Sequence, residues 1–168
     1  RILDAPFVID QGPGLPKWRP ANYGRKFYGA STMRLGIEKS RNLMTVRLAQ
    51  TLGMERIAEY AARFVINDHL PQTLAMSLGA GETTLIRLTT AYAMLVNGGK
   101  QVTPTLIDRI QDRLGRSVYR HDKRACDDCR ADGWHEQRVP HIPDTRKQMT
   151  DPASAYQVVS MLQGVVER

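Results

Sequence analysis

The segment from Thr83 to Gly99 constrains the fold of this chain more than any other part of its sequence. Its apolar residues recur three and four positions apart, which is the spacing of one face of an α-helix. They are Leu85, Leu88, Tyr92, Leu95 and Val96. Thr83 or Thr84 is placed to cap the start of the helix, and Asn97-Gly98-Gly99 is typical of a helix end. The sequence therefore predicts a long amphipathic helix here.

Other stretches show the same helical period. A short helix is predicted from Ser31, as its cap, to Glu38, and the next begins at Asn42 as its cap and ends at Gly53. The residues expected on the apolar faces are Met44, Leu48 and Leu52; Ile57, Ala61, Phe64 and Val65; and Ala155, Val158, Val159, Leu162, Val165 and Val166. The last group belongs to a helix that Asp151 caps and Pro152 opens.

The remaining segments predict little regular structure. Proline, glycine and aromatic residues in 1–30 indicate a loop and β lead-in, and 31–99 is the helical part. Residues 100–120 predict a β-hairpin, 121–149 a polar, exposed excursion, and 150–168 the C-terminal helix. We therefore expect a single partial domain of the α+β class, rich in helix and with a small β portion.

The 168 residues carry a net charge of +7, from 24 Lys and Arg against 17 Asp and Glu. Such a charge attracts nucleic acid, an anionic membrane surface or another anionic polymer. The basic residues are spread along the chain and no nucleic-acid-binding motif is present, so we expect no nucleic-acid partner. No apolar run approaches the roughly 20 residues that span a bilayer, and the chain does not begin with a signal-peptide pattern.

Ser40-Arg41-Asn42 lies at the break between two predicted helices. A hydroxyl and a carboxamide two residues apart at such a break are able to face one cleft. The alternative is local: Ser40 ends one helix and Asn42 caps the next.

Four stretches, taken in order, resemble the transpeptidase domain of class A penicillin-binding proteins, most closely the 1A type of Gram-negative bacteria. They are residues 19–29, 31–42, 77–99 and 156–166. Ser-x-Asn is the middle of the three signatures of this group of enzymes. None of the six serines has a lysine three positions later, however, and no lysine precedes Thr-Gly or Ser-Gly. The Ser-x-x-Lys and Lys-Thr-Gly motifs are thus absent, and the family places them before and after this segment.

The resemblance implies the penicilloyl-serine transferase fold and a peptidoglycan D,D-transpeptidase that works through an acyl-serine intermediate without a cofactor or metal. The implied substrate is the D-Ala-D-Ala stem peptide, and β-lactams bind the same site. The resemblance further implies that Ser40 passes protons near the nucleophile and that Asn42 holds the substrate amide. It also implies that Tyr23 and Asn22 line the same cleft, the alternative being that they pack or form a turn. The parent protein is implied to be periplasmic, bifunctional with a glycosyltransferase, and anchored in the inner membrane through its N-terminus.

Two positions depart from the family pattern, because Val65 stands where glycine is frequent and Thr84 where proline is common. Without the nucleophile, the isolated segment is expected to be inactive, and uncovered helix faces favour its self-association. Two other functions stay open. One is a serine β-lactamase or D,D-carboxypeptidase of the same fold, and the other is a non-enzymatic basic helical binding module.

Cys126-Asp-Asp-Cys129 is not explained by the resemblance. In an oxidising compartment, a local disulfide is the simplest outcome. Zinc is an alternative with His121, His135 and His141 nearby, although five residues between Cys129 and His135 are fewer than zinc fingers use. Free thiols are the third alternative.

Overall fold

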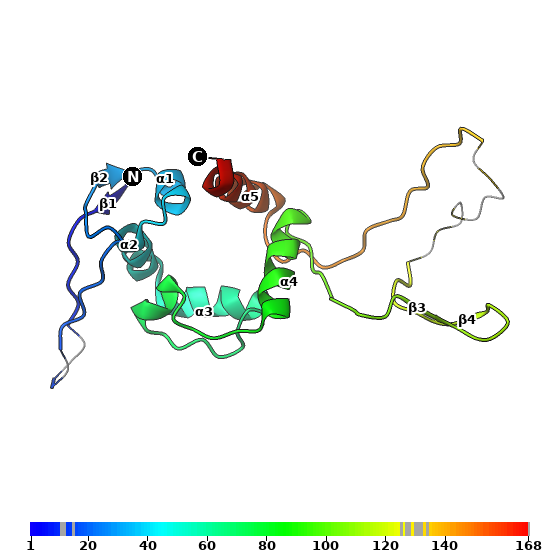
Figure 1. Cartoon of the computed structure of the whole chain (residues 1–168), viewed down its shortest axis with the longest axis horizontal. Coiled ribbons are helices and arrows are strands. Elements are labelled where there is room, and N and C mark those ends of the chain that lie inside the picture. Colours follow the sequence, from blue (N-terminus) through cyan, green and yellow to red (C-terminus); the bar gives the residue numbers. More distant parts are fainter. Residues whose placement is uncertain are drawn as a thin grey trace.

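The computed structural model describes residues 1–168 except 11, 12, 15, 125, 127, 128, 130–132, 134 and 168. The elements in chain order are β1 (Ile2–Asp4), β2 (Gly29–Ser31), α1 (Met33–Glu38), α2 (Asn42–Leu52), α3 (Met54–Arg63), the 3-10 helix η1 (Leu74–Leu78), α4 (Leu85–Val96), β3 (Arg109–Gln111), β4 (Ser117–Arg120) and α5 (Pro152–Glu167). The helices gather at one end, and the β3–β4 hairpin lies far from them at the other (Figure 1).

The N-terminal lead-in is held against α2. Strands β1 and β2 pair antiparallel, with Ile2 opposite Ser31, and α2 packs against β1. The Arg47 side chain of α2 donates to the Pro6 carbonyl at 2.9 Å, and its guanidinium lies over the Phe7 ring. The lead-in therefore has a defined place although it contains little regular structure.

Helix α2 carries the best-buried part of the molecule. Its buried residues are Leu43, Met44, Val46 and Ala49. The predicted face was only partly right, because Leu52 is exposed while Leu43 and Val46 are fully buried. Helix α2 packs against β1, α1 and η1. A single apolar stripe therefore does not describe its burial.

Helix α4 has the predicted bounds, but the prediction of its buried face was mostly wrong, since of the predicted residues only Leu95 packs against the core cluster. Leu85 and Val96 are 81% and 73% exposed, whereas Ala91 and Met94 are buried together with Phe64 and Met149. The prediction for α5 was partly right: Ala155 is buried as predicted, whereas Val165 and Val166 are exposed and Met161, outside the predicted face, is buried. Helical period locates an apolar stripe, but the neighbouring elements decide which part of it is covered.

Two of the four predicted N-terminal helix caps are present, and the other two residues make different contacts. The Thr84 side chain accepts from the Arg87 N–H, and the Asp151 carboxylate from the Ser154 N–H at 2.8 Å, as predicted. The other two caps were wrong. Thr32 caps α1 in place of Ser31, which pairs in β2, and the Asn42 side chain does not cap α2.

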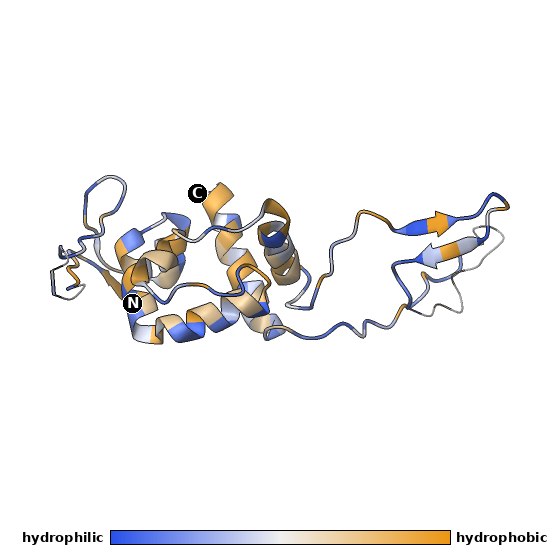
Figure 2. Ribbon diagram, turned by 90° about the horizontal axis from the view of Figure 1, so that it is seen from below, coloured by the Kyte–Doolittle hydropathy of each residue, from blue (hydrophilic) through white to orange (hydrophobic). Residues whose placement is uncertain are grey.

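The predicted hairpin is present as an antiparallel pair in which Arg109 lies opposite Arg120. All residues of both strands are exposed, and the hairpin extends away from the helices (Figure 2). The returning chain meets the helical part again at a bridge between Lys100 and Gln148. Asp144 accepts from Arg146 at 2.8 Å and from Lys100 at 3.0 Å, and these two cations hold the pKa of its carboxyl below the usual range.

Across the described part of the chain, every helix is too short or too polar to cross a bilayer.

Candidate functional site

Ser40 lies in the turn that joins α1 to α2. The Ser40 N–H donates to the Ile37 carbonyl at 3.0 Å, and the Arg41 N–H donates to the Gly36 carbonyl at 2.8 Å. This pair of bonds is the Schellman pattern of helix ends, which requires a left-handed residue and usually has glycine there. Ser40 occupies that position with φ 49°. A side chain in this conformation costs roughly 1–2 kcal/mol relative to an ordinary one.

The Ser40 hydroxyl is available for chemistry. Its residue is exposed, and within the described residues the hydroxyl has no hydrogen-bond partner. Its side chain therefore does nothing for the turn that glycine would not do better. Backbone strain of this kind concentrates at functional sites, where the chemistry of the side chain compensates for its conformational cost.

Asn42 is the first residue of α2, and its carboxamide points back to the lead-in. Its Nδ2 donates to the Ala21 carbonyl at 2.9 Å. The Oδ1 acceptor has no partner in the part of the chain that the structure describes. The bond to Ala21 orients the carboxamide and leaves one N–H and the oxygen for a ligand.

Asn22 is buried, and its side chain is bonded to other parts of the chain. It is 5% exposed, and its Nδ2 donates to both Asp4 carboxylate oxygens, at 2.8 and 3.0 Å, and to the Lys26 carbonyl. Its Oδ1 accepts from the Leu43 N–H. The Asn22 side chain thus links β1, the turn that follows Asn22 and the start of α2. Its burial and these bonds favour the turn interpretation of Asn22, and its place in the substrate cleft stays a prediction.

Tyr23, next in the chain, is fully exposed, so it is free to meet a ligand but is not held by packing. The aromatic ring that does contact the motif is Tyr28, over which the Arg41 guanidinium lies at 3.2 Å from the centroid. This stacking is a favourable cation–π contact. Sequence reasoning did not assign Tyr28 to the motif. It missed Asp4 altogether, because a lone aspartate in a lead-in carries no pattern.

A large apolar groove lies elsewhere, between α3, α4 and α5. Its volume is about 630 Å³, and its walls include Tyr60, Leu88, Tyr92, Val158 and Leu162. Carbon atoms dominate its walls, and neither Ser40 nor Asn42 lies among them. Leu88, Tyr92 and Leu95 of the predicted stripe of α4 line the groove, but the polar chemistry of the motif is not located there.

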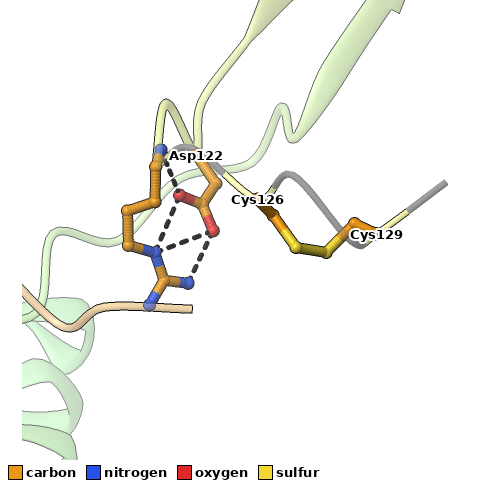
Figure 3. The surroundings of a disulfide bond; sticks show 4 residues. Asp122, Cys126 and Cys129 are labelled. Atoms are coloured by element: carbon orange, nitrogen blue, oxygen red, sulfur yellow. Dashed lines mark hydrogen bonds and ion pairs between the residues drawn. A yellow bond between two sulfur atoms is a disulfide. The ribbon is translucent and has the colours of Figure 1, made fainter. Parts of the chain in front are cut away.

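Cys126 and Cys129 are joined by a disulfide in the structure, with their Cα atoms 5.4 Å apart. Figure 3 shows this bond beside Asp122, whose carboxylate accepts from Arg124. Within the described residues, no three His, Cys, Asp or Glu side chains are grouped as metal ligands. The disulfide therefore accounts for both cysteines in this structure, far from Ser40 along the excursion.

Comparison with known proteins places this geometry in a family. The family described as penicillin binding protein transpeptidase domain matches residues 2–168. Penicillin-binding protein 1A of Rickettsia bellii is 47% identical over 98% of this chain and 21% of its own length. The Neisseria meningitidis protein of that name is 33% identical over 98% of this chain and 19% of its own length. The chain thus spans about one fifth of these curated relatives.

Solved structures agree in fold. The crystal structure of penicillin-binding protein 1A from Haemophilus influenzae superposes with a TM-score of 0.79 at 26% identity, covering 99% of this chain and 26% of that one. A Mycobacterium tuberculosis penicillin-binding protein in complex with penicillin V superposes with a TM-score of 0.71, covering 95% of this chain and 39% of that one. Its 16% identity supports the fold alone. This chain belongs to the penicillin-binding protein transpeptidase domain family.

Proposed function

We propose that this chain forms the middle of a peptidoglycan D,D-transpeptidase domain and supplies Ser40 and Asn42 to its active site. The nucleophilic Ser-x-x-Lys and the Lys-Thr-Gly motif belong to segments of the same protein outside these 168 residues. The observation that carries the proposal is the strained, exposed Ser40, whose hydroxyl lacks a partner within the described residues. Relatives named penicillin-binding protein 1A, similar over 98% of the chain, support it.

In this proposal, the nucleophilic serine attacks the carbonyl of a D-Ala-D-Ala stem peptide, and the terminal D-Ala leaves as an acyl-serine forms. The departing amine needs a proton, and Ser40 relays it from the neighbouring acid–base groups. Asn42 hydrogen-bonds the amide of the bound peptide, or of a β-lactam, through the groups that its bond to Ala21 leaves free. Tyr23 contributes an exposed aromatic surface beside the bound chain.

The same proposal extends to partners and location. We infer that the intact protein is bifunctional with a glycosyltransferase, anchored in the inner membrane, and works in the periplasm on the cell wall. An oxidising compartment is consistent with the disulfide between Cys126 and Cys129. The isolated chain is expected to self-associate through the apolar groove, which sedimentation of the purified chain measures.

The test is covalent labelling by a fluorescent penicillin, followed in time on a denaturing gel. The intact protein is expected to form a long-lived adduct, whereas a β-lactamase of the same fold loses its label quickly by hydrolysis. The isolated 168-residue chain is expected to remain unlabelled because it has no Ser-x-x-Lys. Stoichiometric labelling of the isolated chain, or none of the intact protein, would contradict the proposal.

A further inference from the structure

Helix α1, which leads into Ser40, has almost no apolar anchor. Its two buried residues are Gly36 and Glu38, whereas Met33 and Leu35 are 45% and 40% exposed. A six-residue helix is too short to be stable through its own hydrogen bonds, so contacts with the rest of the molecule hold it. Since Met33, Leu35 and Ile37 are only partly buried, we expect polar contacts to do much of this.

Those contacts are made with α5. The Arg34 Nη1 donates to the Ser160 carbonyl at 3.0 Å, and its Nη2 donates to the Ser160 hydroxyl at 3.2 Å. Arg34 also pairs with Glu38, one turn later on α1, at 3.4 Å. The side chain of Glu38 is only 3% exposed, while that of Arg34 is 41% exposed. A buried carboxylate without its cation is strongly unfavourable. The pair therefore keeps Arg34 in the position from which it bonds Ser160 of α5.

Gly164 of α5 shows how close this approach is. A Cβ at Gly164 would lie 2.2 Å from the Glu38 Oε1 and 2.6 Å from its Cδ. No side chain fits there while Glu38 keeps its place. Gly164 lies in the last turn of α5, and the close approach of Glu38 gives the glycine there a packing reason. We call Arg34, Glu38, Ser160 and Gly164 the α1–α5 clamp.

We propose that the α1–α5 clamp positions Ser40 for proton transfer. Glu38 is the last residue of α1, and Ser40 follows it by two positions in a turn bonded to the Gly36 and Ile37 carbonyls. A shift of α1 along or away from α5 therefore moves the hydroxyl with it. Misplacement of a catalytic group by about 1 Å is enough to cost about 100-fold in rate. The inference rests on the proposed function of Ser40.

The measurement is the second-order rate constant for acylation of the intact protein by a fluorescent penicillin. Glu38→Gln keeps the shape of the side chain but removes its charge, and we expect acylation to slow about tenfold. Gly164→Ala displaces the carboxylate, and we expect a larger loss. Glu59→Gln is the matched control, because Glu59 pairs with Arg63 at i,i+4 on α3 but is 62% exposed. It should leave the rate unchanged.

The decisive comparison repeats both variants in a Ser40→Ala background. If the clamp acts through Ser40, Glu38→Gln and Gly164→Ala will slow acylation less than twofold further once Ser40 is absent. A purely structural role predicts the same loss in both backgrounds, and that result overturns the inference, as does an unchanged rate for Glu38→Gln alone.

If Gly164→Ala fails to fold, Glu38→Gln carries the test, because it adds no volume. Failure of the unmodified protein to label would instead overturn the proposed function, so the two failures are distinguishable.

Discussion

Two helix ends in this chain share a left-handed backbone conformation at a residue other than glycine. Packing against the core accounts for the side chain at only one of them. After α1, Ser40 has φ 49°; after α3, Val65 has φ 61°. In both turns, the residue and its successor donate to the carbonyls three and five positions back. Val65 packs against the core cluster of Phe64, Ala91, Met94 and Met149. Ser40 is exposed and packs on no such cluster.

The difference separates two reasons for tolerating a strained residue. At Val65, buried apolar area offsets the cost of a left-handed conformation in a β-branched residue, which is otherwise an outlier. At Ser40, no burial offsets the cost, so the hydroxyl itself is the feature worth keeping. The comparison thus supports a chemical role for Ser40 and a structural role for Val65.

The largest expected effect comes from removing the Ser40 hydroxyl. In the intact protein, Ser40→Ala should slow acylation by fluorescent penicillin at least about 100-fold, because a proton-transfer group typically contributes that much. Alanine has the same left-handed cost, so the melting temperature should hardly change. Ser117→Ala, on the exposed strand β4, is the control. Unchanged acylation would make Ser40 a helix-end residue only and remove the contrast with Val65.

The next largest effect is expected from removing the Asn22 side chain, which links the lead-in to the start of α2. Asn22→Ala leaves the Asp4 carboxylate, which is 1% exposed, without the amide that donates to both its oxygens. We expect a loss of about 3 kcal/mol in the free energy of unfolding. Asn67→Ala is the matched control, since Asn67 also bonds the backbone of a turn but contacts no buried carboxylate. Equal losses in chemical denaturation would show that the link to Asp4 adds nothing.

Glycine at position 40 separates strain from chemistry. Ser40→Gly should stabilise the fold by about 1 kcal/mol, because glycine adopts the left-handed conformation without the side-chain penalty. The greater entropy of glycine in the unfolded state is included in this figure and reduces the stabilisation. Acylation should fall as far as in Ser40→Ala. Denaturant titration and labelling of the two variants give both quantities. A variant that gains stability and keeps its acylation rate would show that no function maintains the strain.

The smallest effect is expected at the other turn. Val65→Gly relieves the same backbone strain but removes a side chain packed against the core cluster, so the two contributions oppose each other. We expect the free energy of unfolding to stay within about 1 kcal/mol of its original value. A stabilisation equal to that of Ser40→Gly would mean that the packing of Val65 does not offset its backbone strain. The two turns would then not differ in the way proposed here.

Much of the local structure was predictable because it depends on neighbours in the chain. The bounds of α4, the caps Thr84 and Asp151 and the β3–β4 hairpin follow from helical period, capping residues and turn residues. Ser40 and Asn42 were identifiable for a different reason, the resemblance of the surrounding stretches to a known family. The buried faces of α4 and α5 were not predictable, because period does not reveal which face a neighbouring helix covers.

By itself, the sequence determined the helix-rich α+β class, the family and the place of the Ser-x-Asn motif at a helix break, since these depend on residue type and order. Only the tertiary structure decided that Ser40 is strained, that Asn22 bonds Asp4, and that Glu38 fits against Gly164 of α5. Asp4 and Asn22 are 18 positions apart, and Glu38 is still farther from Gly164 along the chain. Contacts over such separations arise from packing of whole elements, which no local pattern encodes.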